Sequence, residues 1–285
     1  MIELAPNHKF GLPVDNPVLL AGGTIGYGEA VYKGVQLEKL GAVVVGPIMR
    51  YGRAGTEEPR VAETNSGFVL NTGLQNRGVS AVVKKISKLW PKLGCPVIAQ
   101  VGDSDRDALT HVATRLNRVD GLYGIELLLP QYADEDLVRR LVQAATRTSD
   151  FPVWVKLPVE TAVMLAPAAM DAGADGLVVA QPPTGTAFRN TTQGFRRKDN
   201  GQHTDEPTVT GSLFGPLAFT FMLNALVSVD RLQITDTLIA CGGIHTLTQA
   251  QQALDVGAKA VQIDGAVWVE PGLPAALVDG LTVDS

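Results

Sequence analysis

The sequence predicts an α/β protein of the (β/α)8 class, a TIM barrel in which eight parallel strands alternate with helices and close on themselves. Short, continuously apolar runs recur along all 285 residues, and helical patterns separate them. No linker rich in Pro, Ser or charge interrupts the alternation, so residues 1–285 are predicted to form one domain. A doubly wound open sheet is the alternative arrangement of the same elements.

A repeated local pattern supports the parallel sheet. In 37–45, 169–179 and 253–263, the end of a helical segment is followed by a glycine and then by a β-branched apolar run. Gly41, Gly173 and Gly257 are predicted to end the three helices in a left-handed conformation. The runs that follow are largely continuous, as expected for strands covered on both faces.

The remaining elements follow from the same two patterns. Further strands are predicted at 18–21, 96–101, 124–129, 152–156 and 238–241, and helices at 79–93, 106–118, 134–148, 162–172, 216–229 and 246–256. Thr246 and Gln249 have the spacing of a capping box at the start of the last of these helices.

Two connections are too long to be simple turns. They span residues 46–76 and 181–212 and leave the carboxyl ends of the second and sixth strands, where barrel enzymes carry their chemistry. We expect the second loop to cover the barrel mouth and to move when no ligand is bound. Arg189 and Arg196 would then bring positive charge to an anionic substrate.

Composition excludes several classes. The net charge of −5 argues against a nucleic-acid partner, and no apolar run is long enough to cross a membrane. Two cysteines are too few for a disulfide framework and fit a cytoplasmic protein. The four histidines lack metal-ligand spacing, so no metal site is predicted.

Two glycine turns suggest a phosphate site. Cys241, Gly242 and Gly243 end the seventh strand, and Asp264 and Gly265 end the eighth. Backbone N–H groups after strands seven and eight of a barrel commonly hold a phosphate. The alternative is a pair of tight turns without a ligand.

Lys156 ends the apolar fifth strand, where a buried ammonium group needs a partner. That partner is a flavin, a phosphate or a carboxylate of a ligand if the lysine is functional. Otherwise the lysine pairs with a neighbouring acidic side chain.

Six segments in register resemble the class 1 dihydroorotate dehydrogenases over nearly the whole chain. They are 16–28, 55–76, 125–127, 155–157, 211–216 and 241–244. The resemblance implies a barrel that binds FMN and a homodimer.

The flavin contacts of that family correspond to specific positions here: Ala21, Gly22, Lys156, Gly215, Cys241, Gly242, Gly243 and Gly265. Lys156 would stabilise negative charge on the reduced flavin ring, which makes it the candidate catalytic residue. A bulky residue in place of Gly243 is expected to fill the phosphate position.

The chain also departs from the family. Gly46 stands where a lysine is expected, Leu128–Gln131 replaces an asparagine and a loop with a Cys or Ser base, and Gln181 falls where an asparagine is expected. Phe214 replaces a small residue, and Asp264 replaces a glycine beside the phosphate. Dihydroorotate is therefore not the expected substrate, because removing its carbon-bound proton requires a base.

Two hypotheses remain. The first is an FMN-dependent oxidoreductase related to dihydroorotate dehydrogenase that acts on a different small molecule. The second is a flavin-free barrel of the same descent, with non-redox catalysis or the role of a partner subunit. Lys156 and the glycine turn favour the first, whereas Gly46, Phe214 and Asp264 favour the second.

Overall fold

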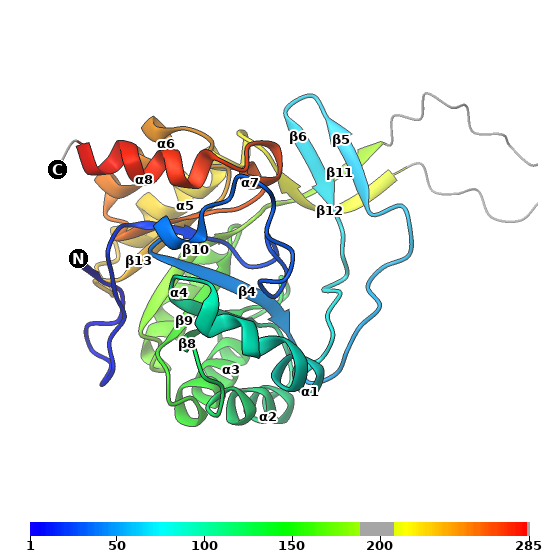
Figure 1. The fold of residues 1–285 in the computed structure, drawn as a ribbon, viewed down its shortest axis with the longest axis vertical. Helices are drawn as coiled ribbons and strands as arrows, with labels where there is room; N and C mark the ends of the chain where they lie inside the picture. The colour runs from blue at the N-terminus through cyan, green and yellow to red at the C-terminus, as the bar shows by residue number, and fades with distance from the viewer. Residues whose placement is uncertain (189–207, 284–285) are drawn as a thin grey trace, which may run out of the picture.

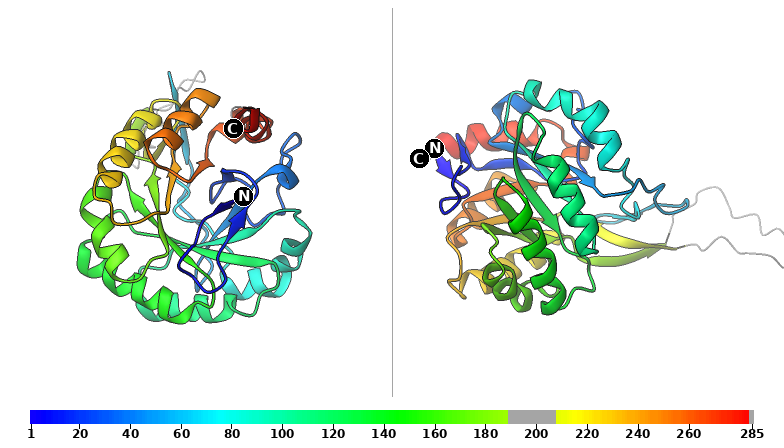
Figure 2. Two further views of the ribbon diagram at one scale, coloured as in Figure 1. Left: turned by 90° about the vertical axis from the view of Figure 1, so that its left-hand side faces the viewer. Right: turned by 90° about the horizontal axis from the view of Figure 1, so that it is seen from below.

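The computed structural model describes residues 1–188 and 208–283, and eight parallel strands in it close into a barrel (Figures 1 and 2). Their order around the barrel is β10-β13-β14-β3-β4-β7-β8-β9. The strands are β3 (Val18–Leu20), β4 (Ala42–Ile48), β7 (Val97–Val101), β8 (Leu122–Leu128), β9 (Val153–Pro158), β10 (Gly176–Gln181), β13 (Leu238–Cys241) and β14 (Ala260–Ile263). The predicted barrel is confirmed, and the open sheet is wrong.

Helices surround the barrel, as the left view of Figure 2 shows. They are η1 (Leu37–Lys39), α1 (Val79–Ala81), η2 (Val82–Ile86), η3 (Ser87–Lys92), α2 (Arg106–Leu116), α3 (Glu135–Thr148), α4 (Ala162–Asp171), α5 (Ala218–Asp230), α6 (Leu247–Val256), α7 (Ala266–Val269) and α8 (Leu273–Val283). The single helix predicted at 79–93 is wrong: it divides into a short α-turn, a π-turn and a 3-10 turn. Pro91 lies in the last turn, and proline has no N–H to continue an α-helical ladder.

The three glycines after helical segments differ from one another. Gly173 and Gly257 have φ of 99° and 130°, as predicted for residues that end a helix. The prediction for Gly41 is wrong, because it is not among the positive-φ residues and follows the extended residue Leu40. Gly41 instead provides room, since a Cβ atom there would collide with the carbonyl oxygen of Asn16.

The barrel interior is apolar at its amino end. Trp154 is fully buried there, and its Nε1 donates a 2.9 Å hydrogen bond to the carbonyl of Leu4. A short hairpin of β1 (Ile2–Glu3) and β2 (Pro13–Val14) brings Leu4 to this position. Because side chains alternate along a strand, Lys156 points into the same interior as Trp154, one layer closer to the carboxyl end.

A second sheet comes from the two long connections, which were predicted as loops. It has the antiparallel order β11-β12-β6-β5 and projects from the barrel in Figure 1. Its strands are β5 (Val61–Thr64), β6 (Gly67–Leu70), β11 (Thr184–Phe188) and β12 (Thr208–Phe214), and they share a small apolar core of Ala62, Val69, Ala187 and Val209. Arg189 and Arg196 lie outside the described residues.

Candidate active site

Four polar side chains from four strands meet in the upper layer of the barrel interior. Glu126 of β8 accepts hydrogen bonds from Nε2 of Gln100 at 2.7 Å and from Nε2 of Gln262 at 2.6 Å. Nζ of Lys156 donates to Oε1 of Gln262 at 2.9 Å and lies 3.6 Å from the Glu126 carboxylate. All four residues are at most 5% exposed, so the group forms a closed polar layer above Trp154.

The charge on Lys156 is stabilised inside this layer. Burial alone would lower the pKa of Lys156, but neighbouring Cys241, Glu126 and Asp264 raise it above its ordinary value. Burial raises the pKa of Cys241 to about 12, so its thiol stays protonated at neutral pH. We therefore assign the raised pKa of Lys156 mainly to the Glu126 carboxylate, which Gln100 and Gln262 hold in place.

Two residues at the carboxyl ends of other strands, Cys241 and Gln181, lie beside Lys156. Cys241 ends β13 and is buried next to the ammonium group. Gln181 ends β10, and its Nε2 donates to the carbonyls of Leu129 at 2.8 Å and of Lys156 at 2.9 Å. Lys156, Gln181 and Cys241 therefore gather at one end of the barrel. The Gln181 amide links residues that follow β8 and lie in β9, so its N–H groups are little available to hydrogen-bond a ligand.

The two glycine turns enclose a carboxylate. Asp264 is 4% exposed, and neither of its carboxylate oxygens has a hydrogen-bond partner among the described residues. Burial raises its pKa, whereas Lys156, His245 and the backbone N–H groups of Gly243 and Gly265 lower it. Those N–H groups are near the carboxylate without reaching full hydrogen-bond geometry. The positively polarised groups predicted to receive a phosphate thus surround the chain's own carboxylate.

An aromatic cluster covers the turn after β14. The rings of Phe68 and Phe214 stack with centroids 5.3 Å apart, and Trp268 packs edge-on against Phe214 at 5.6 Å. A Cβ atom on Gly265 would lie 3.1 Å from Cβ and Cδ1 of Phe214. Phe214 therefore fills the space beside the Cα atom of Gly265, and a side chain at position 265 would be closer to it than ordinary van der Waals contact.

The turn after β13 is packed on its other side. A Cβ on Gly243 would lie 2.8 Å from the carbonyl oxygen of Gly215 and 2.9 Å from the carbonyl carbon of Ala218. Gly243 has φ of 66°, and Gly215 has φ of 131°. The expectation that a bulky residue at 243 would fill the phosphate position is wrong, because its side chain would collide with backbone at the start of α5 instead.

Two further predicted flavin contacts, Ala21 and Gly22, follow β3, and Gly46, where a lysine was expected, lies within β4. Ala21 is 2% exposed, and a Cβ on Gly22 would collide with the amide of Gln100. Gly46 has φ of 135°, and a Cβ there would lie 2.7 Å from the carbonyl oxygen of Gln100. The position where the resemblance expects a lysine thus has a backbone shape that side chains rarely adopt.

FMN fits only part of this site. Lys156 and the glycine turns are the residues that would hold it. The phosphate end does not fit, because the buried Asp264 carboxyl group lies near the N–H groups of Gly243 and Gly265 and the Phe214 ring covers Gly265. Phosphate is larger than the methyl group that would already touch Phe214, and a buried carboxylate repels it.

Sequence reasoning missed Gln100 and Gln262 as part of this site. Each interrupts an otherwise apolar strand, which was the available signal. His245 lies beside Asp264, burial lowers its pKa, and its Nε2 is buried without a partner among the described residues.

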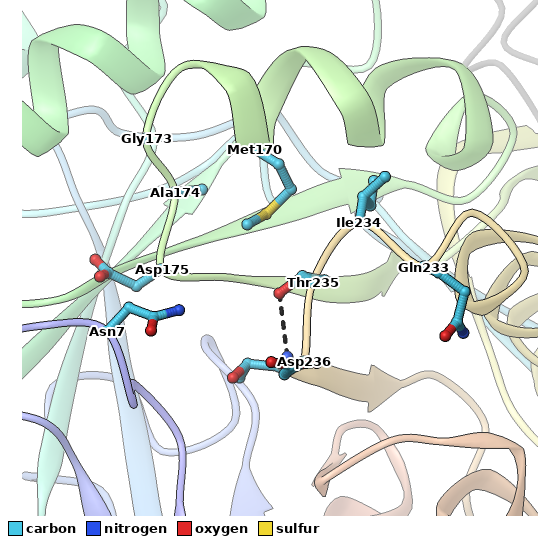
Figure 3. A pocket seen from close by; sticks show the side chains of 10 residues that line it. Asn7, Met170, Gly173, Ala174, Asp175, Gln233, Ile234, Thr235 and Asp236 are labelled. Carbon is cyan, nitrogen blue, oxygen red and sulfur yellow. Dashed lines mark hydrogen bonds between the residues drawn. The ribbon is translucent and has the colours of Figure 1, made fainter.

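A separate hollow lies at the opposite end of the barrel. It has a volume of about 390 Å³, and Figure 3 shows Asp175 and Asn7 on one side of it and Thr235 and Asp236 on the other. Asp175 directly precedes β10, so this hollow belongs to the amino ends of the strands. That end of a barrel contributes to stability rather than to chemistry.

The described residues contain neither a metal-binding cluster nor a membrane-spanning helix. No cluster of three or more His, Cys, Asp or Glu side chains has an arrangement that would hold a metal ion. None of the described helices combines the length and the apolar character required to span a membrane.

Comparison with known proteins gives one consistent result. The family model described as dihydroorotate dehydrogenase matches residues 6–283. The catalytic subunit of dihydroorotate dehydrogenase B (NAD(+)) from Endomicrobium trichonymphae is 31% identical over 281 residues, covering 95% of this chain and 89% of the relative. Dihydroorotate dehydrogenase A (fumarate) from Limosilactobacillus reuteri is 31% identical over 278 residues, covering 92% of this chain and 86% of the relative.

Proposed function

This chain belongs to the dihydroorotate dehydrogenase family, and from that premise we propose that it is a flavin-free barrel that does not oxidise dihydroorotate. The observation that carries the proposal is the position of Asp264. Its carboxylate takes the place beside Gly243 and Gly265 where the resemblance expects a phosphate.

Features around the barrel mouth support the rejection of dihydroorotate. Leu128 and Leu129 follow Glu126 and Leu127 where the resemblance expects an asparagine and a loop with a base. The side-chain amide of Gln181 donates to the carbonyls of Leu129 and Lys156. Oxidation of dihydroorotate requires a base to take a carbon-bound proton while a cofactor takes the hydride. Among the described residues no base follows Glu126 in that place, and the Gln181 amide is already hydrogen-bonded within the barrel.

The burial of the reactive groups favours a partner subunit over a catalyst. Glu126, Lys156, Cys241 and Asp264 are each at most 4% exposed, and Lys156 and Glu126 already engage each other. Side chains that are buried and already paired with one another stabilise the barrel, but a substrate cannot reach them.

An FMN-dependent oxidoreductase with a different small-molecule substrate is the second candidate. Lys156 favours it, because the ammonium group lies at the carboxyl end of β9, where the resemblance requires it beside a flavin ring. The flavin would supply hydride transfer, and Lys156 would hold negative charge on the reduced ring. Under this second candidate, the cofactor would also contact five further residues: Ala21, Gly22, Gly215, Cys241 and Gly242.

The wider setting is part of the same proposal. Two unpaired cysteines support a reducing cytoplasm, and the net charge of −5 supports the absence of a nucleic-acid partner. A homodimer is proposed on the resemblance alone.

The visible absorption spectrum of the purified protein tests the proposal. We expect a colourless protein that releases no flavin on denaturation and takes up none from a solution of FMN. We also expect no turnover of dihydroorotate with fumarate, NAD or a dye as acceptor. Yellow protein with a stoichiometric flavin, or turnover at ordinary rates of about 1–1000 per second, would overturn it.

A further inference from the structure

We infer that Asp264 is a built-in substitute for a cofactor phosphate, and that Asp264 and Phe214 together keep FMN out of an otherwise retained barrel. The inference rests on the proposed function and deepens it, because it assigns the loss of flavin to two named side chains.

The surroundings of Asp264 are those of an anion site. Burial raises the pKa of this carboxyl group, and the Lys156 ammonium, the His245 ring and the N–H groups of Gly243 and Gly265 partly offset that rise. Asp264 is only 4% exposed, and neither of its carboxylate oxygens has a hydrogen-bond partner among the described residues. A buried carboxylate without partners is costly unless the surrounding field compensates it.

The carboxylate also excludes a second anion. A phosphate placed on the N–H groups of Gly243 and Gly265 would lie beside the Asp264 carboxyl group, and whenever that group is ionised the two like charges would repel within a site of low dielectric constant. The groups of positive polarity around the site are backbone N–H groups, the His245 ring and one lysine that is already paired with Glu126, so two adjacent anions would compete for few donors. Charge alone therefore opposes the phosphate.

Phe214 excludes the phosphate by volume. Its Cβ and Cδ1 would lie 3.1 Å, and its Cγ 3.3 Å, from a Cβ on Gly265. The ring cannot swing away freely, because it is stacked on Phe68 and packed against Trp268. Trp268 is itself fixed by a 3.1 Å hydrogen bond from Nε1 to the carbonyl of Thr24.

Apart from the lysine that Gly46 replaces, the barrel retains much of what the resemblance expects of a flavin site. Lys156 remains buried at the carboxyl end of β9, and Gly242 and Gly243 keep positive φ after β13. Removing the two obstructing side chains should therefore restore binding without further redesign.

The test is gain of FMN binding in the double variant Asp264→Gly plus Phe214→Ser. FMN affinity is measured by quenching of flavin fluorescence in the wild type, both single variants and the double variant. We expect binding in the double variant to be at least about 100-fold tighter than in the wild type, since adjacent like charges cost several kcal/mol. Riboflavin, which lacks the phosphate, should gain far less than FMN.

Two control variants distinguish the effect of the Asp264 charge on FMN binding from the effect of side-chain volume. Asp264→Asn removes the charge but keeps the size, and together with Phe214→Ser it should recover part of the gain. Phe68→Ala loosens the aromatic cluster without uncovering Gly265 directly, so alone it should gain nothing. Circular dichroism and melting temperature confirm that each variant is folded. Protection of the double variant from thermal unfolding by inorganic phosphate gives a readout that needs no flavin ring.

The outcomes separate the two proposals. Tight FMN binding by the wild type would overturn the proposed function. A wild type and a folded double variant that both fail to bind FMN and phosphate would overturn this inference and leave the proposed function standing. Equal gains for FMN and riboflavin would also overturn it, because the phosphate would then not be what the two side chains exclude.

Discussion

Lys156 and Gln262 are 106 positions apart in the chain, yet Nζ of the lysine donates a 2.9 Å hydrogen bond to Oε1 of the glutamine inside the barrel. Nε2 of the same glutamine donates to Glu126 at 2.6 Å, so the lysine and the carboxylate are joined both directly and through Gln262. The polar layer therefore contains a positive and a negative side chain in contact, and all of their hydrogen-bond partners within the layer are buried.

This arrangement predicts strong coupling between Lys156 and Glu126. Lys156→Met should lower the free energy of unfolding by about 3–5 kcal/mol, because it leaves a buried carboxylate without its cation. Lys156→Met combined with Glu126→Gln should be less destabilised than the sum of the single variants, by about 0.5–3 kcal/mol. Urea unfolding of the four proteins measures the cycle. Additive effects would mean that the two side chains do not depend on each other.

Asp264 predicts a pH-dependent difference between the wild type and Asp264→Asn. The pKa of Asp264 is raised by burial, so the folded state binds its proton more tightly than the unfolded state does. Its contribution to stability is present below the ordinary value of 3.8 and is lost as pH rises through the raised value.

The asparagine cannot lose a proton, so Asp264→Asn should become progressively more stable than the wild type as pH rises above about 4. The slope should not exceed about 1.4 kcal/mol per pH unit, which corresponds to one proton. Lys156, His245 and Cys241 also face Asp264, and all three are present in both proteins. Urea unfolding between about pH 4 and pH 8 provides the comparison. A difference independent of pH would contradict the raised pKa.

Both cysteines should resist alkylation in the folded protein. Burial raises the pKa of Cys95 and that of Cys241 to about 12, and the thiolate is the reactive form. At about pH 8 both should react with iodoacetamide roughly a thousand-fold more slowly than a free cysteine with its pKa of about 8.5. In urea the two should react at the ordinary rate. Rapid labelling of folded Cys241, which is 1% exposed, would indicate that the barrel end opens.

Gly124 predicts a packing effect below the polar layer. A Cβ there would lie 3.1 Å from Cη2 of Trp154 and closer still to Cζ3, and that rigid ring has no room to move. Gly124→Ala should therefore lower the free energy of unfolding by about 1–3 kcal/mol. Gly272→Ala is the matched control, because nothing lies within 4 Å of its Cβ position. Its effect should stay within about 0.5 kcal/mol. Thermal and urea unfolding of both variants decide the point, and equal effects would refute the proposed crowding.

Local signals in the sequence predicted most of the barrel. The apolar runs from Val18 to Ile263 identified all eight strands, because a strand covered on both faces must be apolar along its whole length. The capping box of α6 was also local: the backbone N–H of Gln249 donates to the Thr246 hydroxyl at 3.2 Å, and Oε1 of Gln249 accepts from the N–H of His245.

The second sheet had no comparable signal. Its strands β5, β6, β11 and β12 are short, and β5 pairs with β6 while β6 pairs with β12, more than 130 positions away. Only four residues form its core, so hydrophobic periodicity was too weak to separate these strands from loop.

The sequence by itself determined the barrel, the residue at each strand end and the departures at Gly46, Phe214 and Asp264. Local patterns suffice for these because each depends on a residue and its near neighbours in the chain. Only the tertiary structure decided what the departures do. Strand closure brings Lys156, Cys241 and Asp264 into one field, and β12 lays Phe214 across Gly265. Whether a carboxylate points towards a phosphate site or away from it depends on contacts between residues far apart in the chain, and no local pattern encodes that direction.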